Sequence, residues 1–346
     1  MIASNDILEA NLSITICGPI ERETHDFLGT HNGALRLRTM LPQAELILVT
    51  WVGQEQNIPH HQYDKVISLP DPGATQLQKI SGQTYYINYR RLVYAAYEGA
   101  KAASRDWLWR LRSDCIVENL SIFNEYKALE RGFEPSSFTF FSSPVLIPNI
   151  YTRDCRKTNF VGHPSDLMHY GKTADLLQLF TCSVESRFYN QKLVSHFTFP
   201  NGQQVQGAEY VPEQMIWISF VERMAPNYSW HRIHNRVLLL SPFVVINHEK
   251  AIFSNFVLAS FAALGLAFKK DFSTLHGSAS CYSPKDYINY RFNASSTPLA
   301  YCIQLLSLSF SAHYVPLGKF LWRRLTSVAA HYLSQKLPKK EKIPKN

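Results

Sequence analysis

Short apolar runs alternate with longer amphipathic stretches over the first 120 residues. The apolar runs are rich in β-branched and aromatic side chains and end at turn-forming residues, which is typical of buried strands. They lie at residues 12–17, 44–51, 65–69 and 107–111. Residues 24–41 and 86–103 instead carry apolar positions at helical spacing. The pattern therefore predicts strands that are separated by helices.

Strands that alternate with helices at this spacing indicate an α/β fold with a mainly parallel central sheet flanked by helices. In such sheets, ligands bind at the carboxyl ends of the strands. Candidate binding residues are therefore those that follow the predicted strands, namely Gly18, Pro19, Thr50, Trp51, Asp71 and Asp114.

The pattern changes in the middle of the chain. Residues 138–147 are typical of a strand, and residues 163–180 of a polar turn that leads into a helix. Pro212 is well placed to open a helix that ends near residue 222. Residues 237–247 predict one or two further strands. We therefore assign residues 1–250 to one folded domain.

The remaining residues, 251–346, are expected to form a helical C-terminal region. Residues 251–268 are an apolar stretch of 18 residues, which just reaches the length of a membrane span. Its polar residues and its glycine favour a helix packed on the core or on a bilayer surface. Apolar residues then recur at steps of three and four, at Leu317, Leu321, Leu325, Val328 and Tyr332. This basic amphipathic pattern predicts a helix in a membrane interface, and a core-packed helix with a solvated tail is the alternative.

The formal charge of +8 is concentrated in the same region. Residues 319–346 contain eight basic residues and one acidic residue, which leaves about +1 for the rest of the chain. Proteins that bind nucleic acids usually spread their basic residues over a folded face, and no nucleic-acid motif is visible. The tail therefore indicates an anionic membrane surface as a partner, and no nucleic acid.

The cysteines and the N-terminus bear on location. The six cysteines lie far apart without a C-x-x-C pair, which is typical of reduced thiols in the cytosol. Asp6 and Glu9 stand where a signal peptide would carry basic residues and an apolar run. We therefore expect a cytoplasmic protein that is peripherally associated with the inner face of the cytoplasmic membrane.

The sharpest local feature is Arg112-Ser113-Asp114, which directly follows an apolar strand. An aspartate at a strand end can hold a divalent cation, and the cation neutralises a diphosphate. The sequence contains no G-x-G-x-x-G, G-x-x-x-x-G-K, H-E-x-x-H or G-x-S-x-G motif. The common dinucleotide, P-loop, zinc-protease and hydrolase signatures are therefore absent.

Several motifs together resemble one family in their order and spacing. They are ITICGPI (14–20), PQAELILVTW (42–51), DPG (71–73), NYRR (88–91), WRLRSD (109–114), HPSDLMHYG (163–171) and PEQ (212–214). This combination is similar to the WavE family of lipopolysaccharide-synthesis proteins over roughly residues 12–250. The family is regarded as GT-A-like glycosyltransferases. The resemblance implies a nucleotide-sugar donor and a surface glycan acceptor of the lipopolysaccharide or capsule type.

The resemblance also implies a donor pocket. Its walls would be the residues that follow the first two strands, namely Gly18, Pro19, Ile20, Thr50 and Trp51. A glycine there would let the backbone approach the ligand closely. Trp51 can equally be an ordinary core residue.

Polar groups further along the chain would bind the nucleotide. Asp71 would hydrogen-bond the base or ribose, and Asn88 and Arg91, at i and i+3 of one helix, would reach the diphosphate. As alternatives, Asp71 sets its own turn and Asn88 caps the helix.

The resemblance places Arg112-Ser113-Asp114 where related enzymes carry Asp-x-Asp. Because Arg112 replaces the first acid, two hypotheses stay open: Asp114 binds Mn²⁺ or Mg²⁺ alone, or Arg112 itself neutralises the charge. Arg112 can also simply pair with a nearby carboxylate. A late histidine completes the metal site in some GT-A enzymes, and of His231, His234 and His248 we select His234 as the second metal ligand.

Sugar transfer with inversion needs a carboxylate that takes the proton from the acceptor hydroxyl. Glu213 is the first candidate, because it opens a helix where such enzymes place their base. Asp166, in the turn His-Pro-Ser-Asp, is the second candidate. The helix dipole favours the ionised form of Glu213. The alternatives are a helix N-terminal charge for Glu213 and a helix cap for Asp166.

We therefore expect a glycosyltransferase that moves a sugar from a nucleotide-sugar donor to a lipid-linked or membrane-bound glycan. One alternative is transfer of a sugar phosphate or polyol phosphate, which would release a nucleoside monophosphate. The other is a non-catalytic scaffold that binds glycans or nucleotides, whose cellular function would survive Asp114→Ala and Glu213→Ala.

Deletion of residues 315–346 should weaken binding to anionic vesicles by more than about tenfold, because the tail carries most of the positive charge. Co-sedimentation with vesicles of phosphatidylserine and phosphatidylcholine measures the effect. Nucleotide binding should be unchanged in the same variant. Vesicle binding that survives the deletion would mean that the tail is not the membrane-binding element.

Overall fold

The computed structural model describes residues 9–23, 29–78, 84–131, 133, 135–155, 161–190, 194–198, 204–208, 210–226, 242–260, 262–269 and 280–296. The predicted interfacial helix, the basic tail, His231 and His234 lie outside these residues.

A seven-stranded sheet forms the centre of the molecule. Its strand order is β12 (Phe256–Ala259), β8 (Val145–Pro148), β9 (Met168–Lys172), β6 (Trp107–Arg112), β1 (Leu12–Cys17), β2 (Glu45–Trp51) and β3 (Lys65–Leu69). Strand β9 is antiparallel to β6 and β8, and the other neighbouring pairs are parallel. The predicted α/β fold is therefore confirmed as a mixed, mostly parallel sheet flanked by helices.

Helices α2 (Gly29–Met40) and α3 (Tyr89–Ala102) cover the two faces of the β1–β2 part of the sheet. Every residue of β1 and β2 is buried, as expected for strands with both faces covered. Ile47 and Val49 of β2 pack with Ala95 of α3, while Leu46 and Leu48 share a cluster with Leu37 of α2. Since successive side chains of a strand point to opposite faces, the two helices lie on opposite sides.

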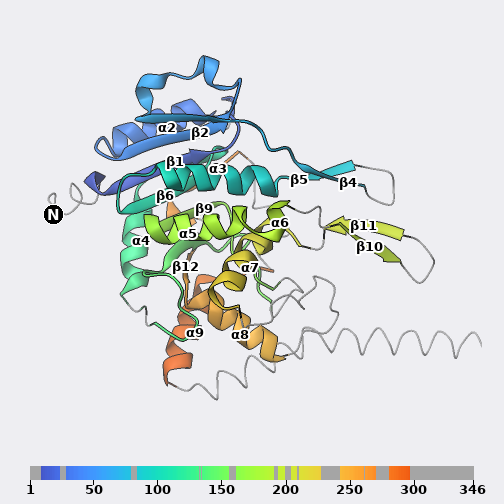
Figure 1. Ribbon diagram of the computed structural model, residues 1–346. Coiled ribbons are helices and arrows are strands. Elements are labelled where there is room, and N and C mark those ends of the chain that lie inside the picture. Colours follow the sequence, from blue (N-terminus) through green and yellow to red (C-terminus); the bar gives the residue numbers. More distant parts are fainter. Residues whose placement is uncertain are drawn as a thin grey trace, which may run out of the picture.

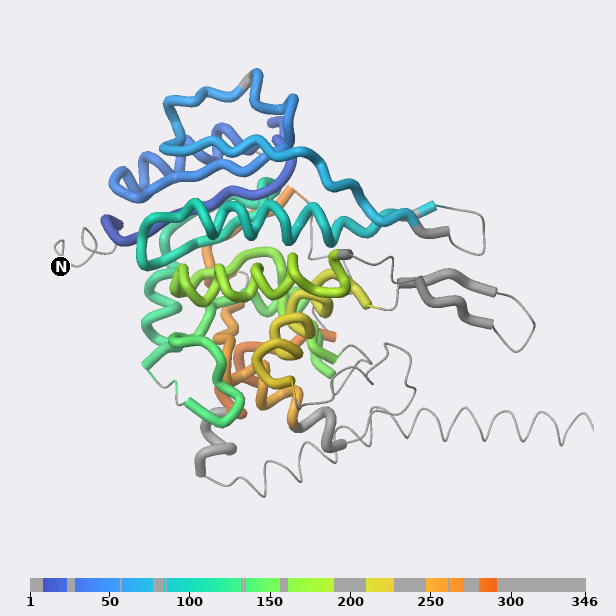
Figure 2. The backbone as a smooth tube through the Cα atoms, viewed as in Figure 1, coloured from blue at the N-terminus to red at the C-terminus, as the bar shows by residue number. Residues whose placement is uncertain are grey.

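Helices α3, α5 (Thr173–Val184) and α7 (Pro212–Met224) form a layer on one face, with α5 in contact with both neighbours (Figures 1 and 2). Three further helices, α4 (Ser121–Glu130), α8 (Pro242–Phe253) and α9 (Pro284–Ser296), contact β12. The short helix α6 (Arg187–Asn190) contacts both α5 and α7. Although β12 follows residue 250, it pairs directly with β8 in the central sheet.

Two hairpins extend from the same side of the molecule (Figure 1). They are β4 (Thr75–Gln78) with β5 (Thr84–Ile87), and β10 (Val194–Thr198) with β11 (Gln204–Ala208). Strands β4 and β11 contact each other. A third antiparallel pair joins β7 (Cys115–Val117) to β13 (Leu266–Phe268).

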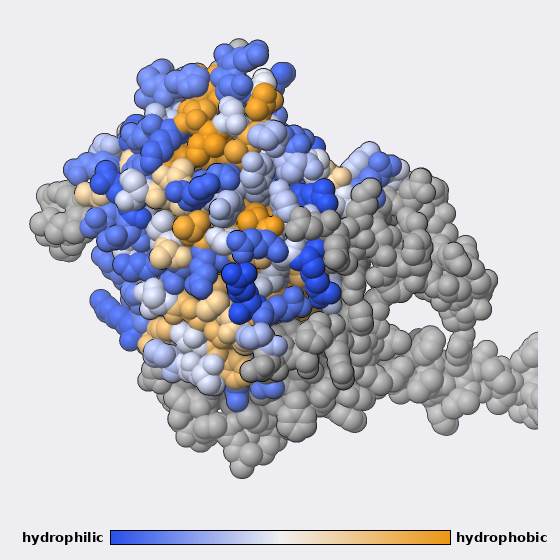
Figure 3. Space-filling model, viewed as in Figure 1, coloured by the Kyte–Doolittle hydropathy of each residue, from blue (hydrophilic) through white to orange (hydrophobic). Residues whose placement is uncertain are grey.

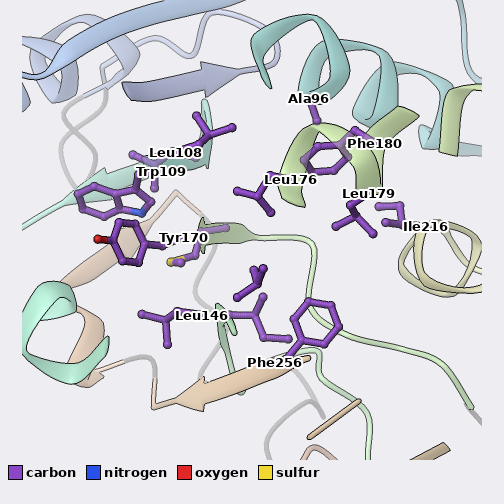
Figure 4. Packing of buried hydrophobic residues seen from close by; sticks show 14 of the residues in the cluster. Ala96, Leu108, Trp109, Leu146, Tyr170, Leu176, Leu179, Phe180, Ile216 and Phe256 are labelled. Atoms are coloured by element: carbon purple, nitrogen blue, oxygen red, sulfur yellow. The ribbon is translucent and has the colours of Figure 1, made fainter. Parts of the chain in front are cut away.

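Aromatic side chains join β6 and β9 to α4 in the core. Figure 4 shows Trp109 and Tyr170 side by side, and both rings lie edge-on to Phe123 of α4 at centroid distances of 5.7 and 5.5 Å. In the same view, Leu176 and Phe180 of α5 lie between the sheet and α3. These contacts fix β9 against its neighbour β6, to which it runs antiparallel.

None of the helices in the described ranges is long and apolar enough to cross a membrane. On the face shown in Figure 3, hydrophobic residues are interspersed with hydrophilic ones.

The predicted helix over residues 251–268 is wrong. Helix α8 ends at Phe253, and the rest of the stretch contains β12 and β13. Asn255 ends the helix, because its Nδ2 donates to the carbonyl of Ala251 at 2.8 Å and its Oδ1 accepts from the amide of Phe140 at 2.7 Å. Gly265 turns the chain with a positive φ of 63°. Apolar runs are compatible with either buried strands or a buried helix. The length of 18 residues suggested one continuous helix, whereas the structure divides the stretch into shorter elements.

The strands predicted within 237–247 are wrong from Pro242 onward, where the helix α8 begins with proline in its first turn. The strand predicted over 138–147 is confined to β8, and the helix predicted within 163–180 is preceded by β9. These segments carry β-branched or apolar residues without a clear period, so tertiary packing decided their conformation.

Glu45 joins β1, β2 and β3 at the amino ends of the strands. Its carboxylate accepts hydrogen bonds from Ser13 Oγ at 2.5 Å, Ser104 N at 2.8 Å and Lys65 Nζ at 2.7 Å. Burial alone would raise the pKa of Glu45, but these donors lower it from an ordinary value of 4.5 to about 2. The carboxylate therefore stabilises the folded state as long as it is ionised.

Glu45→Gln should lower the free energy of unfolding at pH 7 by about 2 kcal/mol, because the buried Ser13 and two further donors lose a charged acceptor. The pKa of Glu45 is lower in the folded than in the unfolded chain, so its stabilising effect is complete above pH 4.5 and is lost as the pH falls toward about 2. The difference between wild type and variant should shrink over that range in urea unfolding. The control Glu98→Gln removes a partly exposed ion pair with Lys101, whose atoms are 3.8 Å apart, and should change stability little.

Candidate functional site

A cleft of about 840 Å³ lies at the carboxyl ends of β1, β2 and β6. The loops that follow these strands form its walls, together with the start of α3 and the start of α7. It brings together most of the predicted site residues, namely Gly18, Pro19, Trp51, Asp71, Asn88, Arg91, Arg112, Ser113, Asp114, Asp166 and Glu213. The cleft also contains residues that the sequence analysis missed, among them Glu21, Gln54, Tyr86, Arg110 and Lys269.

Thr50 and Ile20 do not line the cleft, and Ile20 instead lines a separate hollow next to it. Thr50 is fully buried, and its Oγ1 donates to Gln54 Oε1 at 2.9 Å. The backbone amide of Ile20 donates to the same oxygen at 2.9 Å. Both residues therefore hold Gln54, which itself lines the cleft.

Gly18 is required by the close approach of β1 and β6. Its φ is +133°, and a Cβ there would lie 2.6 Å from Ser113 Oγ. Its amide donates to the carbonyl of Val49, while the amide of Ser113 donates to that of Cys17, both at 3.0 Å. The glycine thus lets three strand ends meet at the floor of the cleft.

Asp71, Asn88 and Arg91 form one group. The Arg91 guanidinium donates to both carboxylate oxygens of Asp71, from Nε at 2.7 Å and from Nη2 at 2.5 Å, and its Nη1 donates to Asn88 Oδ1 at 3.1 Å. Asp71 also accepts from the amide of Gly73, so it sets its turn as well. Arg91 lowers the pKa of Asp71. This arrangement orients Arg91 and leaves N–H groups of the guanidinium for another acceptor.

Arg112 connects the carboxylates of the cleft. Its Nε and Nη2 donate to Asp114 Oδ1 and Oδ2 at 3.0 and 2.7 Å, and its Nη1 lies 3.9 Å from Asp166 Oδ1. Burial lowers the pKa of Arg112, but the charges of Asp166 and Asp114 outweigh this and raise it. The guanidinium is thus a fixed positive charge at the end of β6.

The described residues do not match the donor set of a Mn²⁺ or Mg²⁺ site. Both oxygens of Asp114 already accept from Arg112, and within the described part of the chain no three His, Cys, Asp or Glu residues are grouped to hold a metal. His248 Nε2 accepts from the amide of Gly162 at 2.6 Å, so this nitrogen is used inside the fold. His234, the predicted second ligand, lies outside the described residues. Among the described groups, the positive charge beside Asp114 comes from Arg112.

Asp166 and Glu213 both line the cleft, and they lie close enough for the charge of Glu213 to act on Asp166. Burial and the neighbouring charge of Glu213 raise the pKa of Asp166 to about 6. Burial likewise raises the pKa of Glu213. His163 Nε2 lies 3.8 Å from Glu213 Oε2, and burial lowers the pKa of this histidine to about 4. The arrangement can therefore accept a proton near neutral pH, with a neutral imidazole beside it.

Residues 12–319 match the family described as WavE lipopolysaccharide synthesis. The chain belongs to this family. No curated protein matches the chain. The resemblance inferred from the motifs is thus confirmed, over a longer span than the motifs themselves covered.

Two residues of this WavE-family chain that the sequence analysis missed hold its acidic pair in place. Arg110 is 1% exposed, and its Nη1 donates to the backbone carbonyl of Asp166. Gln214 Nε2 donates to the carbonyl of Val161 at 2.6 Å, which ties the first turn of α7 to the segment before Asp166. The signal for Arg110 was present, since an arginine inside an apolar strand needs a buried acceptor.

In the WavE-family chain, Gly18→Ala should destabilise the fold by about 2–4 kcal/mol, from a strained φ and the contact with Ser113 Oγ. Gly53→Ala is the matched control, because Gly53 also has a positive φ of 92° but nothing lies within 4 Å of its added Cβ. That variant should lose only about 1 kcal/mol. Thermal unfolding measures both.

The contact itself is tested by the double variant Gly18→Ala/Ser113→Ala, which removes the clashing hydroxyl and should recover part of the lost stability. Equal losses for Gly18→Ala and Gly53→Ala would show that close packing at the floor of the cleft is unimportant.

Proposed function

We propose that this WavE-family protein is a GT-A-like glycosyltransferase that moves a sugar from a nucleotide-sugar donor to a lipopolysaccharide-type glycan. The observation that carries the proposal is the cleft in which Arg91 and Arg112, each held by a carboxylate, face the same space as Asp166 and Glu213. Guanidinium groups suit a diphosphate, and a carboxylate with a raised pKa suits proton transfer. Family membership supports the choice of glycan.

The cleft suggests a division of roles along its length. A nucleoside diphosphate group lies against Arg91 and Arg112, and the transferred sugar points toward Glu213. Glu213 takes the proton from the attacking acceptor hydroxyl as the new bond to the anomeric carbon forms. The bond from that carbon to the phosphate oxygen breaks, and the two guanidiniums stabilise the negative charge on the leaving diphosphate. Glu213 is preferred to Asp166 because its side chain is more exposed, at 17% against 6%.

The acceptor in this proposal is lipid-linked or otherwise membrane-bound. The basic C-terminal residues 319–346 then hold the protein at an anionic membrane surface. Attachment to the membrane would bring the cleft close to the glycan that the enzyme extends.

Nucleotide binding is tested by thermal shift with UDP, GDP, CDP, CMP and ADP, each with Mn²⁺ and with EDTA. A ligand at about 100 times its Kd stabilises by about 2.7 kcal/mol, so a bound nucleotide should raise the Tm clearly. Arg91→Gln and Arg112→Gln should each weaken binding by about tenfold or more, because each removes a charge-assisted contact. The control Arg36→Gln changes an exposed arginine on α2 that contacts Glu118 outside the cleft.

The effect of EDTA separates the two hypotheses for Asp114. A shift that persists in EDTA and is lost in Arg112→Gln would support charge neutralisation by the guanidinium. A shift that requires Mn²⁺ would place a cation on Asp114.

Transfer itself is measured with nucleotide sugars of the class that binds and with lipopolysaccharide from cells that lack this protein. Glu213→Gln should lower the rate by about 10²–10⁴ while leaving nucleotide binding intact. Absence of any nucleotide shift together with absence of transfer would overturn the proposal.

A further inference from the structure

A second group of side chains lies at the same edge of the sheet, beyond the cleft. Tyr151 and Arg153 follow the carboxyl end of β8, which runs parallel to β6 because both are antiparallel to β9. Neither residue lines the cleft described above. Burial raises the pKa of the Tyr151 phenol, and the charges of Arg153, Glu213, Arg112 and Asp166 also act on this pKa. The group therefore lies near the acidic pair but outside the cleft.

The backbone of Tyr151 is in a conformation that side chains rarely adopt. Its φ is +64°, and among the described residues it is the only one other than glycine with a positive φ. A tyrosine in this region is strained, and such strain persists where the surrounding structure imposes it, often at ligand sites. A glycine or asparagine would be expected here if only the turn mattered.

The neighbouring residues hold this conformation from several sides. Thr152 Oγ1 donates to the carbonyl of Pro148 at 2.8 Å and accepts from the amide of Ser165 at 3.1 Å. The amide of Tyr282 donates to the carbonyl of Thr152 at 2.9 Å. These bonds fix Tyr151 relative to the loop that carries Asp166.

Arg153 adds a positive charge to the group. Its guanidinium lies over the Tyr151 ring, 5.4 Å from the centroid, and its Nη1 donates to Ser280 Oγ. Its backbone amide donates to the carbonyl of His163 at 3.0 Å, which places it beside the histidine that faces Glu213. Within the described ranges, no carboxylate forms an ion pair with Arg153. The remaining N–H groups of the guanidinium suit a phosphate or carboxylate.

We propose that Tyr151 and Arg153 form an acceptor subsite that takes a sugar carrying an anionic group. The tyrosine ring packs against the sugar, and the guanidinium binds its phosphate or carboxylate. The acceptor hydroxyl then lies beside Glu213, on the side opposite the leaving diphosphate. The role as acceptor rests on the proposed transferase function, whereas binding of an anionic sugar does not.

Binding is tested on the full chain by isothermal calorimetry or ligand-observed NMR with glucose 6-phosphate, glucuronate and glucose. At least one of the two anionic sugars should bind about tenfold or more tightly than glucose. The reason is that glucose has no anionic group to form a charge-assisted hydrogen bond with the guanidinium of Arg153. The tighter of the two identifies phosphate or carboxylate as the preferred group. Arg153→Gln should remove the preference and leave the weak affinity for glucose.

Tyr151→Gly should weaken binding of all three sugars, because it removes the ring while glycine accepts the left-handed backbone. Arg36→Gln serves as the matched control for removal of a positive charge elsewhere. Circular dichroism and the Tm of each variant establish that it is folded.

Equal binding of glucose and both anionic sugars by the wild type would overturn the proposal, as would a preference that survives Arg153→Gln. A preference lost in Arg91→Gln but kept in Arg153→Gln would place the anionic group in the nucleotide cleft instead, which also overturns it. The nucleotide panel separates the two proposals. If nucleotides raise the Tm but the anionic sugars bind no better than glucose, the transferase proposal stands and the subsite proposal fails. If the anionic sugars bind better than glucose but no nucleotide raises the Tm, the subsite proposal stands and the transferase proposal fails.

Discussion

Two arginines on the central strand β6 impose the main constraint on this structure. Arg110 is almost completely buried and Arg112 is largely so, although β6 lies in the middle of the sheet between β1 and β9. A buried guanidinium is costly unless acceptors surround it. Asp114 follows on the same chain segment, but the remaining acceptors come from the loop around Asp166. That loop is therefore required by the charges on β6.

The antiparallel direction of β9 allows the loop to meet this requirement. A strand in the parallel direction would begin at the opposite edge of the sheet. Because β9 runs the other way, its amino end lies at the carboxyl ends of β6 and β1, and Asp166 arrives next to Arg112. Gln214 then fastens the start of α7 to the same loop, so Glu213 joins the group. The antiparallel strand thus brings two carboxyl groups with raised pKa values to a site whose positive charges come from the parallel half.

Electrostatic interactions make the two sides of the cleft chemically different. On the parallel side, the guanidiniums of Arg91 and Arg112 are paired with Asp71 and Asp114, which orients them while keeping spare N–H donors. On the side of β9, burial and mutual repulsion keep the pKa of Asp166 near 6. The parallel side therefore favours a polyanionic ligand, and the side of β9 favours proton transfer. The sugar transfer that we propose would need both.

The parallel half of the fold and most of its cleft could be predicted from the sequence. Strands at 12–17 and 65–69 agree with the structure, since each is a short β-branched run with a clear turn after it. The polar residues after these strands converge because carboxyl ends of parallel strands share an edge. The apolar stretch 251–268 was misassigned, because a run buried on all sides has no period to distinguish helix from strand.

What the sequence by itself determined is the order of local elements and the residue types at the strand ends, since these depend on short-range pattern and turn chemistry. Only the tertiary structure decided which charges meet. The pairing of Arg112 with Asp166 joins residues 54 positions apart across an antiparallel strand that no local pattern revealed. The same holds for the left-handed Tyr151, whose conformation is imposed by hydrogen bonds from distant segments. Such contacts depend on strand direction and packing, which are properties of the whole fold.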